Sequence, residues 1–214
     1  MRAVEARTNP PAMRRSLHLL ITLTTLAHTA AAQRWGHSGL GAKLGGQLCN
    51  LIASDRTYLA VPGAVAGAYV PLLVSDRLEL QPELLLSYQG SDLQQVERDA
   101  IRLRMLYLQV PLSAKLFLTN VINLQAGVQA GRCLQAKADD VDVTDDMRTY
   151  DVGFTAGLGV DLQRGLDITA RYYGGTTPTL HSTTGVNPRH QLIQLTAGLR
   201  LMRFSHRRGR GHRG

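Results

Sequence analysis

The chain has 214 residues, enough for one domain of ordinary size. Its formal net charge of +8 would suit a nucleic-acid-binding protein, but the excess positive charge lies at the two ends. Residues 33–202 contain 15 Lys and Arg and 15 Asp and Glu, so the body of the protein is neutral and we expect no nucleic-acid partner.

The N-terminal segment has the pattern of a secretory signal peptide. Two arginines precede an apolar run over residues 17–27, and three alanines follow it. The run is shorter than the roughly 20 apolar residues with which a helix spans a bilayer, which disfavours the alternative of an uncleaved anchor. We therefore expect residues 1–32 to be a cleaved signal peptide, with Met13 as a candidate start of translation.

From residue 39 onward, apolar residues alternate with small or polar ones, as in strands whose two faces differ. The alternation is clearest at 106–116, whereas 63–74 is rich in Ala and Gly and its orientation stays open. In chain order, the strands are expected near residues 39–48, 63–74, 78–87, 106–116, 122–131, 151–162, 166–173 and 193–201.

Strand length and connection length favour a membrane barrel over a soluble sandwich. Several strands reach about ten residues, the length with which a tilted strand crosses a bilayer. Short connections at 75–76, 119–120 and 163–165 alternate with long ones, as do the periplasmic turns and external loops of outer-membrane barrels. The expected external loops are residues 50–62, 90–100, 134–148 and 174–190.

These features predict an all-β protein, an eight-stranded antiparallel transmembrane up-and-down β-barrel. The barrel is expected over residues 33–204, with both ends periplasmic because the number of strands is even. Residues 205–214 are rich in Arg and Gly, which predicts a disordered, solvated tail. With a signal peptide in front, the barrel is expected in the outer membrane of a Gram-negative-type envelope, surrounded by outer-membrane lipid.

The charged residues of the strands fall on the face opposite the apolar residues, so a membrane barrel would carry them inside. The interior of an eight-stranded barrel is just wide enough for side chains to fill it, and opposite charges there can pair. The alternative, a soluble lipocalin-like barrel, needs an apolar interior to hold its ligand. The predicted charge network of the lumen comprises Lys43, Glu79, Glu83, Lys115, Asp161, Asp167, Arg171 and Arg200.

Several segments resemble motifs of the PorT-like outer-membrane β-barrel family. Residues 107–115 are similar to its "YLEIPLLLKY" strand, and residues 81–90 are similar to its "LQPELLYSxKG" strand. Glycine-rich segments at 39–46 and 153–161 look like its first and sixth strands. The resemblance covers about residues 39–202. It implies an eight-stranded outer-membrane barrel without an assigned activity and permits a role in an envelope export machine.

An acidic segment is the only candidate for a metal site. Its carboxylates are hard oxygen ligands that suit calcium, but the segment lacks the glycine and the distal glutamate of an EF-hand. We expect a solvated external loop and neither a bound metal nor a cofactor. The carboxylates belong to Asp139, Asp140, Asp142, Asp145 and Asp146.

Two further sets of residues have a structural interpretation. Cys49 and Cys133 are expected to face inward from opposite strands, too far apart for the Cα separation of about 7 Å that a disulfide permits. Aromatic residues are expected to anchor the barrel at the membrane interfaces. They are Trp35, Tyr58, Tyr69, Tyr88 and Tyr172.

Catalysis is not expected. His181 and Ser182, with His190 nearby, are the only hint of a nucleophile, but adjacent residues of an extended chain point to opposite sides. We expect a non-enzymatic monomer with a structural or interaction role, whose external loops contact partners or ligands, other envelope proteins being one candidate class. The alternatives are an export-machine component, a narrow channel and the soluble ligand binder.

Overall fold

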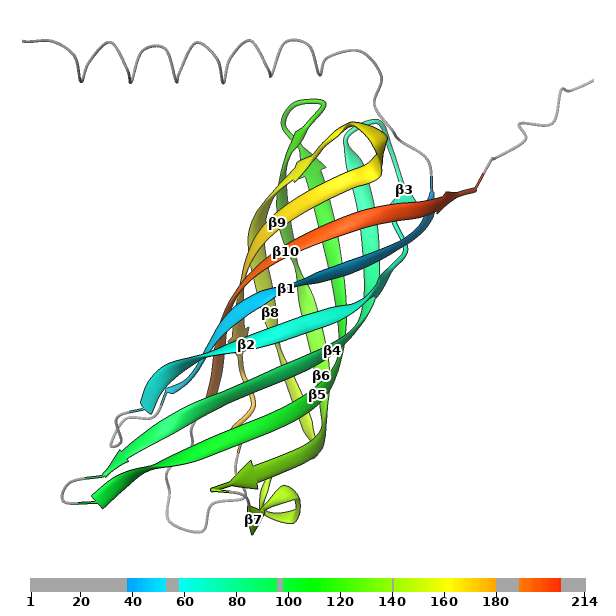
Figure 1. The fold of residues 1–214 in the computed structure, drawn as a ribbon. Coiled ribbons are helices and arrows are strands. Elements are labelled where there is room, and N and C mark those ends of the chain that lie inside the picture. The colour runs from blue at the N-terminus through cyan, green and yellow to red at the C-terminus, as the bar shows by residue number, and fades with distance from the viewer. Residues whose placement is uncertain (1–37, 53–57, 96–97, 140, 180–188, 205–214) are drawn as a thin grey trace, which may run out of the picture.

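The computed structural model describes residues 38–52, 58–95, 98–139, 141–179 and 189–204. Eight strands form a closed ring in which each pairs antiparallel with the next and the last pairs with the first (Figure 1). The predicted fold class is confirmed. The ring consists of β1 (Gly39–Ile52), β2 (Tyr58–Tyr69), β4 (Leu78–Gln95), β5 (Arg98–Phe117), β6 (Ile122–Ala138), β8 (Tyr150–Asp161), β9 (Leu166–Gly175) and β10 (Arg189–Arg203).

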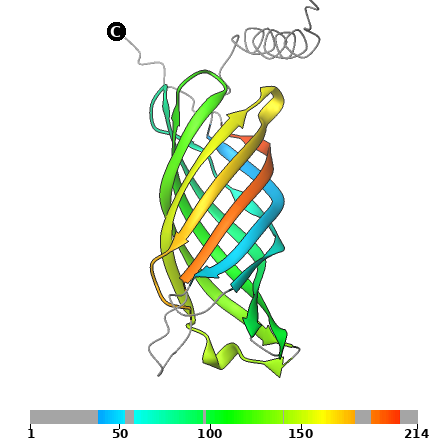
Figure 2. The same ribbon diagram turned by 90° about the vertical axis from the view of Figure 1, so that its left-hand side faces the viewer.

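The strands expose their apolar residues and bury their polar ones. In β1, Leu44 and Leu48 are 68% and 53% exposed, whereas Lys43 and Gln47 are buried. The same alternation continues around the wall, where β9, β10 and β1 lie side by side (Figure 2). An apolar outer band around a polar interior is the arrangement of a membrane barrel and the reverse of a lipocalin-like one. No helix in the described part of the chain is long and apolar enough to span a bilayer.

The orientation of β2, which the sequence leaves open, follows from its pairing with β1. Val65 and Tyr69 are buried in the lumen, so the alanines between them face outward. The Tyr69 ring lies across Gly41 of β1, where a Cβ atom would overlap it. Tyr69 was expected to be an interfacial anchor, and this prediction was wrong: its glycine neighbour makes room for the ring inside the barrel.

The short connections and both ends of the barrel lie at one end of the molecule, at the top of Figure 1. The β2–β4 connection contains β3 (Leu72–Leu73), so it is longer than the predicted two-residue turn at 75–76. The β8–β9 connection is a 3₁₀ turn, η2 (Gln163–Gly165), in which Arg164 and Gly165 have φ values of 69° and 85°. By the alternation of turn lengths, this end corresponds to the predicted periplasmic end.

At the opposite, external end the strands extend further than predicted. Strands β4 and β5 pair through residues 89–93 and 101–105, so residues 90–100 are mostly strand and not a loop. Likewise, part of 50–62 belongs to β1 and β2, and β6 continues to Ala138. Beyond the apolar band the outer face no longer needs apolar residues: residues 89–92 of β4 are small or polar, and in β5 Met105 is buried while Arg102 is exposed. These strand ends therefore lack the outward apolar face used for prediction.

The external connections themselves differ in form. After β6 the chain forms β7 (Val141–Asp142), which pairs back onto β6, and a 3₁₀ turn, η1 (Thr144–Asp146). The β9–β10 connection begins after Gly175 and ends before Arg189, close to the predicted bounds. The predicted signal peptide and basic tail lie outside the described residues, as does Trp35.

Candidate functional site in the barrel lumen

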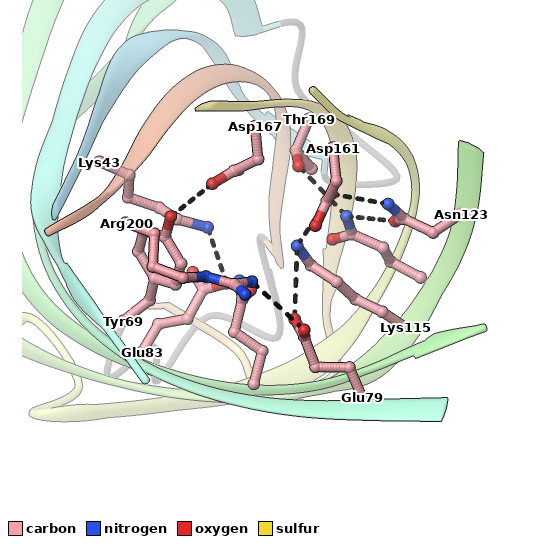
Figure 3. Close-up of polar contacts among 12 residues, drawn as sticks. Lys43, Tyr69, Glu79, Glu83, Lys115, Asn123, Asp161, Asp167, Thr169 and Arg200 are labelled. Atoms are coloured by element: carbon pink, nitrogen blue, oxygen red, sulfur yellow. Dashed lines mark hydrogen bonds and ion pairs between the residues drawn. The ribbon is translucent and has the colours of Figure 1, made fainter. Parts of the chain in front are cut away.

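The charged residues of the predicted network meet in the periplasmic half of the lumen, where they form contacts from one wall to another (Figure 3). They arrive there because the strand period of two puts every second residue inside. All eight residues of the predicted network contribute a contact to this cluster. Four are cations and four are anions, so the cluster has no formal net charge.

Glu83 is the centre of the first part of the cluster. It accepts a hydrogen bond of 2.9 Å from Lys43 and two hydrogen bonds, of 2.7 and 3.0 Å, from the Arg171 guanidinium. Arg171 on β9 lies across the ring from Glu83 on β4, with three strands between them on either side. This bidentate ion pair therefore spans the lumen. The side chains of Lys43, Glu83 and Arg171 are all buried.

Glu79 organises the second part. Its carboxylate lies 3.8 Å from the Lys115 ammonium and 3.3 Å from the Arg200 guanidinium. Lys115 also lies 3.5 Å from Asp161 of β8. These contacts connect β4, β5, β8 and β10, so this part too joins distant portions of the wall.

Asp167 has a partner that the sequence did not indicate. The Tyr69 hydroxyl donates a hydrogen bond of 2.6 Å to it, from β2 to β9. The Lys43 ammonium lies 4.9 Å from the centre of the Tyr69 ring, a cation–π distance. The tyrosine thus links an anion and a cation of the cluster.

Neutral polar side chains complete the cluster. Gln81 donates to Glu83 at 2.7 Å, and Asn123 donates to Asp161 at 2.9 Å. Gln125 accepts from Arg171 at 3.2 Å and donates to Asn123 at 2.9 Å. The alternation in the sequence already places these amide side chains on the inward face, but the predicted network of the lumen contained only charged residues. These amides matter because a buried ion pair needs its remaining hydrogen bonds satisfied.

The external half of the lumen has a different character. Gln47 donates a hydrogen bond to Ser87 at 2.7 Å and accepts one from Gln194 at 2.8 Å. These three side chains form a neutral polar layer on the external side of the charged cluster. Beyond this layer, the Tyr107 hydroxyl lies 3.3 Å from His190 Nε2, with the two rings edge to face.

An acidic residue and a second tyrosine lie in the same external half, on the neighbouring strands β8 and β9. Tyr173 and Thr177 each donate to Asp151, at 2.7 and 2.6 Å. Apolar side chains surround both pairs, in two clusters that contain Met105 and Leu192. Asp151, Tyr173 and Thr177 were not among the candidate residues from the sequence.

Comparison with known proteins agrees with this geometry. Residues 37–180 match the model of the outer membrane protein β-barrel domain. The chain belongs to this outer-membrane β-barrel family. No curated protein matches it.

Among solved structures, Neisserial surface protein A is 11% identical and superposes with a TM-score of 0.51, covering 77% of this chain and 99% of that one. Ail of Yersinia pestis, in complex with a heparin analogue, has 13% identity, a TM-score of 0.48 and coverages of 78% and 99%. OprG of Pseudomonas aeruginosa has 10% identity, a TM-score of 0.40 and coverages of 77% and 98%. At these identities the likeness concerns the fold alone.

In this member of the outer-membrane β-barrel family, the cysteines are buried free thiols in the external half of the lumen. They lie in different apolar clusters: Cys49 packs with Tyr173, and Cys133 packs with Tyr107. Of the residues considered for catalysis, His181 and Ser182 lie outside the described residues. His190 is buried and faces Tyr107, a phenol and not a serine hydroxyl.

The acidic segment forms local hydrogen bonds. Asp142 accepts from the Thr144 hydroxyl and backbone N–H at 2.6 and 2.9 Å, and both bonds lower the pKa of the Asp142 carboxyl. Asp139 accepts from the Arg102 backbone N–H at 3.0 Å. Within the described residues, no three His, Cys, Asp or Glu side chains converge as metal ligands. Asp140 lies outside that part of the chain.

Proposed function

We propose that the protein is a closed, non-enzymatic barrel of the outer membrane that acts through its external end. The observation that carries this proposal is the Glu83–Arg171 pair, which crosses the lumen at 2.7 Å. The protein would be a monomer that presents its external connections to other molecules of the envelope or the surroundings. The alternative role, a channel, requires a continuous aqueous path past this pair.

The energetics of the lumen oppose such a path. Buried charges are tolerated only when they are paired and hydrogen-bonded, and separating one partner leaves a charge whose burial costs several kcal/mol. A permeating solute would have to displace Arg171, which is held by Glu83 at two points and by Gln125 at a third. An eight-stranded barrel offers little space to pass around them.

The external end supplies the candidate interaction surface. Strands β4 and β5 project there beyond their neighbours (Figure 1), and β7 and η1 form a small ordered structure on β6. In many proteins, the residues that bind partners lie on loops that a rigid scaffold, here the barrel wall, holds in position. His190 is buried inside the barrel against Tyr107, so it is not part of this surface.

The resemblance of residues 81–90 and 107–115 to PorT-like motifs supports a more specific form of the proposal, in which the partner is a component of an envelope export machine. Mild cross-linking in intact cells, followed by purification of the barrel, distinguishes the two forms. A reproducible set of export components would favour the specific form, and recovery of the barrel alone would contradict it.

Conductance in planar bilayers tests the closed lumen. The wild-type barrel is expected to show no stepwise conductance in 1 M KCl. The wild-type barrel is compared with the double variant Glu83→Ala and Arg171→Ala, which lacks the ion pair that crosses the lumen. Stepwise conductance of the wild-type protein, at the same level in both proteins, would overturn the proposal in favour of a channel.

A further inference from the structure

A tyrosine and a histidine meet across the external half of the lumen. The Tyr107 hydroxyl lies 3.3 Å from His190 Nε2, and the two ring centres are 5.3 Å apart in an edge-to-face arrangement. Tyr107 on β5 and His190 on β10 have three strands between them on either side of the ring, so the pair joins opposite walls. Each residue is 1% exposed. This is a second connection across the barrel, built from a phenol and an imidazole instead of an ion pair.

The same pair supports a segment at the external end, where β7 lies in Figure 1. Residues 141–149, called the cap below, contain β7 and η1 and precede β8. Met147 of the cap is buried in one apolar cluster with Tyr107. The Thr144 hydroxyl accepts a hydrogen bond of 2.9 Å from the backbone N–H of Ala136 on β6. The cap is therefore held by a few contacts, and one of them is a side chain of the pair.

One charged residue acts on His190 in the described part of the chain. Asp151 of β8 lies in the same external half and favours the imidazolium electrostatically. Its carboxylate is already engaged, because it accepts hydrogen bonds of 2.7 Å from Tyr173 and 2.6 Å from Thr177. No ion pair joins Asp151 to His190 among these residues. The anion therefore offsets only part of the cost of a buried positive charge.

The other groups around His190 are neutral near pH 7. The inward residues of β2 and β4 in this half are apolar or amide side chains, such as Val61 and Gln89. Burial in these surroundings lowers the pKa of His190 from its ordinary value of 6.5. His190 therefore stabilises the closed end at neutral pH, and this contribution is lost as the pH falls. The remaining titratable side chains here are phenols and thiols, those of Tyr107, Tyr173, Cys49 and Cys133.

Protonation changes what His190 can do. A neutral imidazole can accept the hydrogen bond of the Tyr107 hydroxyl at Nε2, whereas an imidazolium has only donors. Its charge would also lie among apolar side chains, which is unfavourable. His190 is the second residue of β10, so it can turn toward water when the end of one strand opens.

We propose that His190 is an acid-sensitive switch: its protonation separates it from Tyr107 and releases the cap, while the charged cluster keeps the periplasmic half closed. The cap belongs to the proposed interaction surface, so the switch would regulate that surface, and in this respect the inference rests on the proposed function. Release of the cap itself requires no partner.

The test is hydrogen–deuterium exchange of the refolded barrel in detergent micelles, from about pH 8 to about pH 5, the range in which a histidine changes charge. Rates are corrected for the intrinsic effect of pH on exchange. The amides of Val143 and Arg148 donate to backbone carbonyls of β6 and of the β9–β10 connection. They should lose protection about tenfold at the acidic end, because a pKa difference of about one unit changes an equilibrium about tenfold. Far-ultraviolet circular dichroism should stay constant, since the wall remains closed.

Three variants locate the effect. His190→Gln cannot take up a proton and should remove the acid response. The matched control, His181→Gln, changes a histidine of the preceding connection, outside the described residues, and should keep the response. Asp151→Asn removes the anion that favours the imidazolium, so the ratio of acidic to neutral exchange rates should rise.

The proposal is overturned if the wild type shows no acid response, if His190→Gln responds as strongly, or if His181→Gln abolishes the response. A smaller ratio in Asp151→Asn would also overturn it, because acid would then act on the carboxylate. So would loss of the circular dichroism signal, which would mean that acid unfolds the barrel. If His190→Gln does not fold, nitrogen NMR of the wild type replaces it: the His190 ring must titrate at the pH at which the cap loses protection. None of these outcomes bears on the closed lumen, which conductance tests separately.

Discussion

Removing the carboxylate of Glu83 is the sharpest perturbation of the lumen. Glu83→Gln keeps the size of the side chain but leaves Lys43 and Arg171 buried without their shared anion. Breaking a buried ion pair by neutralising one partner costs about 3–5 kcal/mol, so we expect the free energy of unfolding to fall by about that much. Asp76→Asn, an exposed acidic residue in the periplasmic turn, should change it by less than about 0.5 kcal/mol.

The assay is urea unfolding of the barrel in detergent micelles or lipid vesicles, followed by far-ultraviolet circular dichroism. A double-mutant cycle with Arg171→Met isolates the pair, and we expect a coupling energy of about 1–3 kcal/mol between Glu83 and Arg171. If Glu83→Gln were as stable as the wild type, or if the two substitutions were additive, the ion pair would not hold the lumen together and our reasoning would be refuted.

Other predictions concern the wall, the thiols and the acidic segment. Gly41→Ala should destabilise the barrel by about 1–3 kcal/mol because the new methyl group overlaps the Tyr69 ring, whereas Gly46→Ala, which meets open space, should not; urea unfolding compares them. Cys49 and Cys133 should resist a membrane-impermeant maleimide until the barrel is unfolded, and labelling of native protein, read by mass spectrometry, would contradict their burial. Calcium titrated to millimolar concentration should give no binding heat in calorimetry, and a saturable heat would show that the acidic segment holds a metal after all.

The sequence predicted the architecture well because a strand has a strict period of two. Once the apolar face of β1 is identified, the inward position of Lys43 follows, and the same holds for Glu83 and Arg171 on their own strands. Two faces of opposite character, combined with alternating connection lengths, leave few folds other than a membrane barrel.

Which residues meet inside could not be predicted, because contacts across the lumen depend on the stagger of the strands around the ring. The Tyr69–Asp167 hydrogen bond is an example: it joins β2 to β9, and the sequence alone gives neither the orientation of β2 nor its register against β1. Strand ends were also missed at the external end, because backbone pairing continues there without an outward-facing apolar row to mark it.

The most direct test of the account is the heat-modifiable mobility of the protein extracted from outer-membrane fractions. A closed barrel held by a continuous ring of strands should resist detergent at room temperature and migrate faster on a gel before boiling than after it. Recovery in the soluble periplasmic fraction, with the same mobility before and after boiling, would contradict a closed membrane barrel.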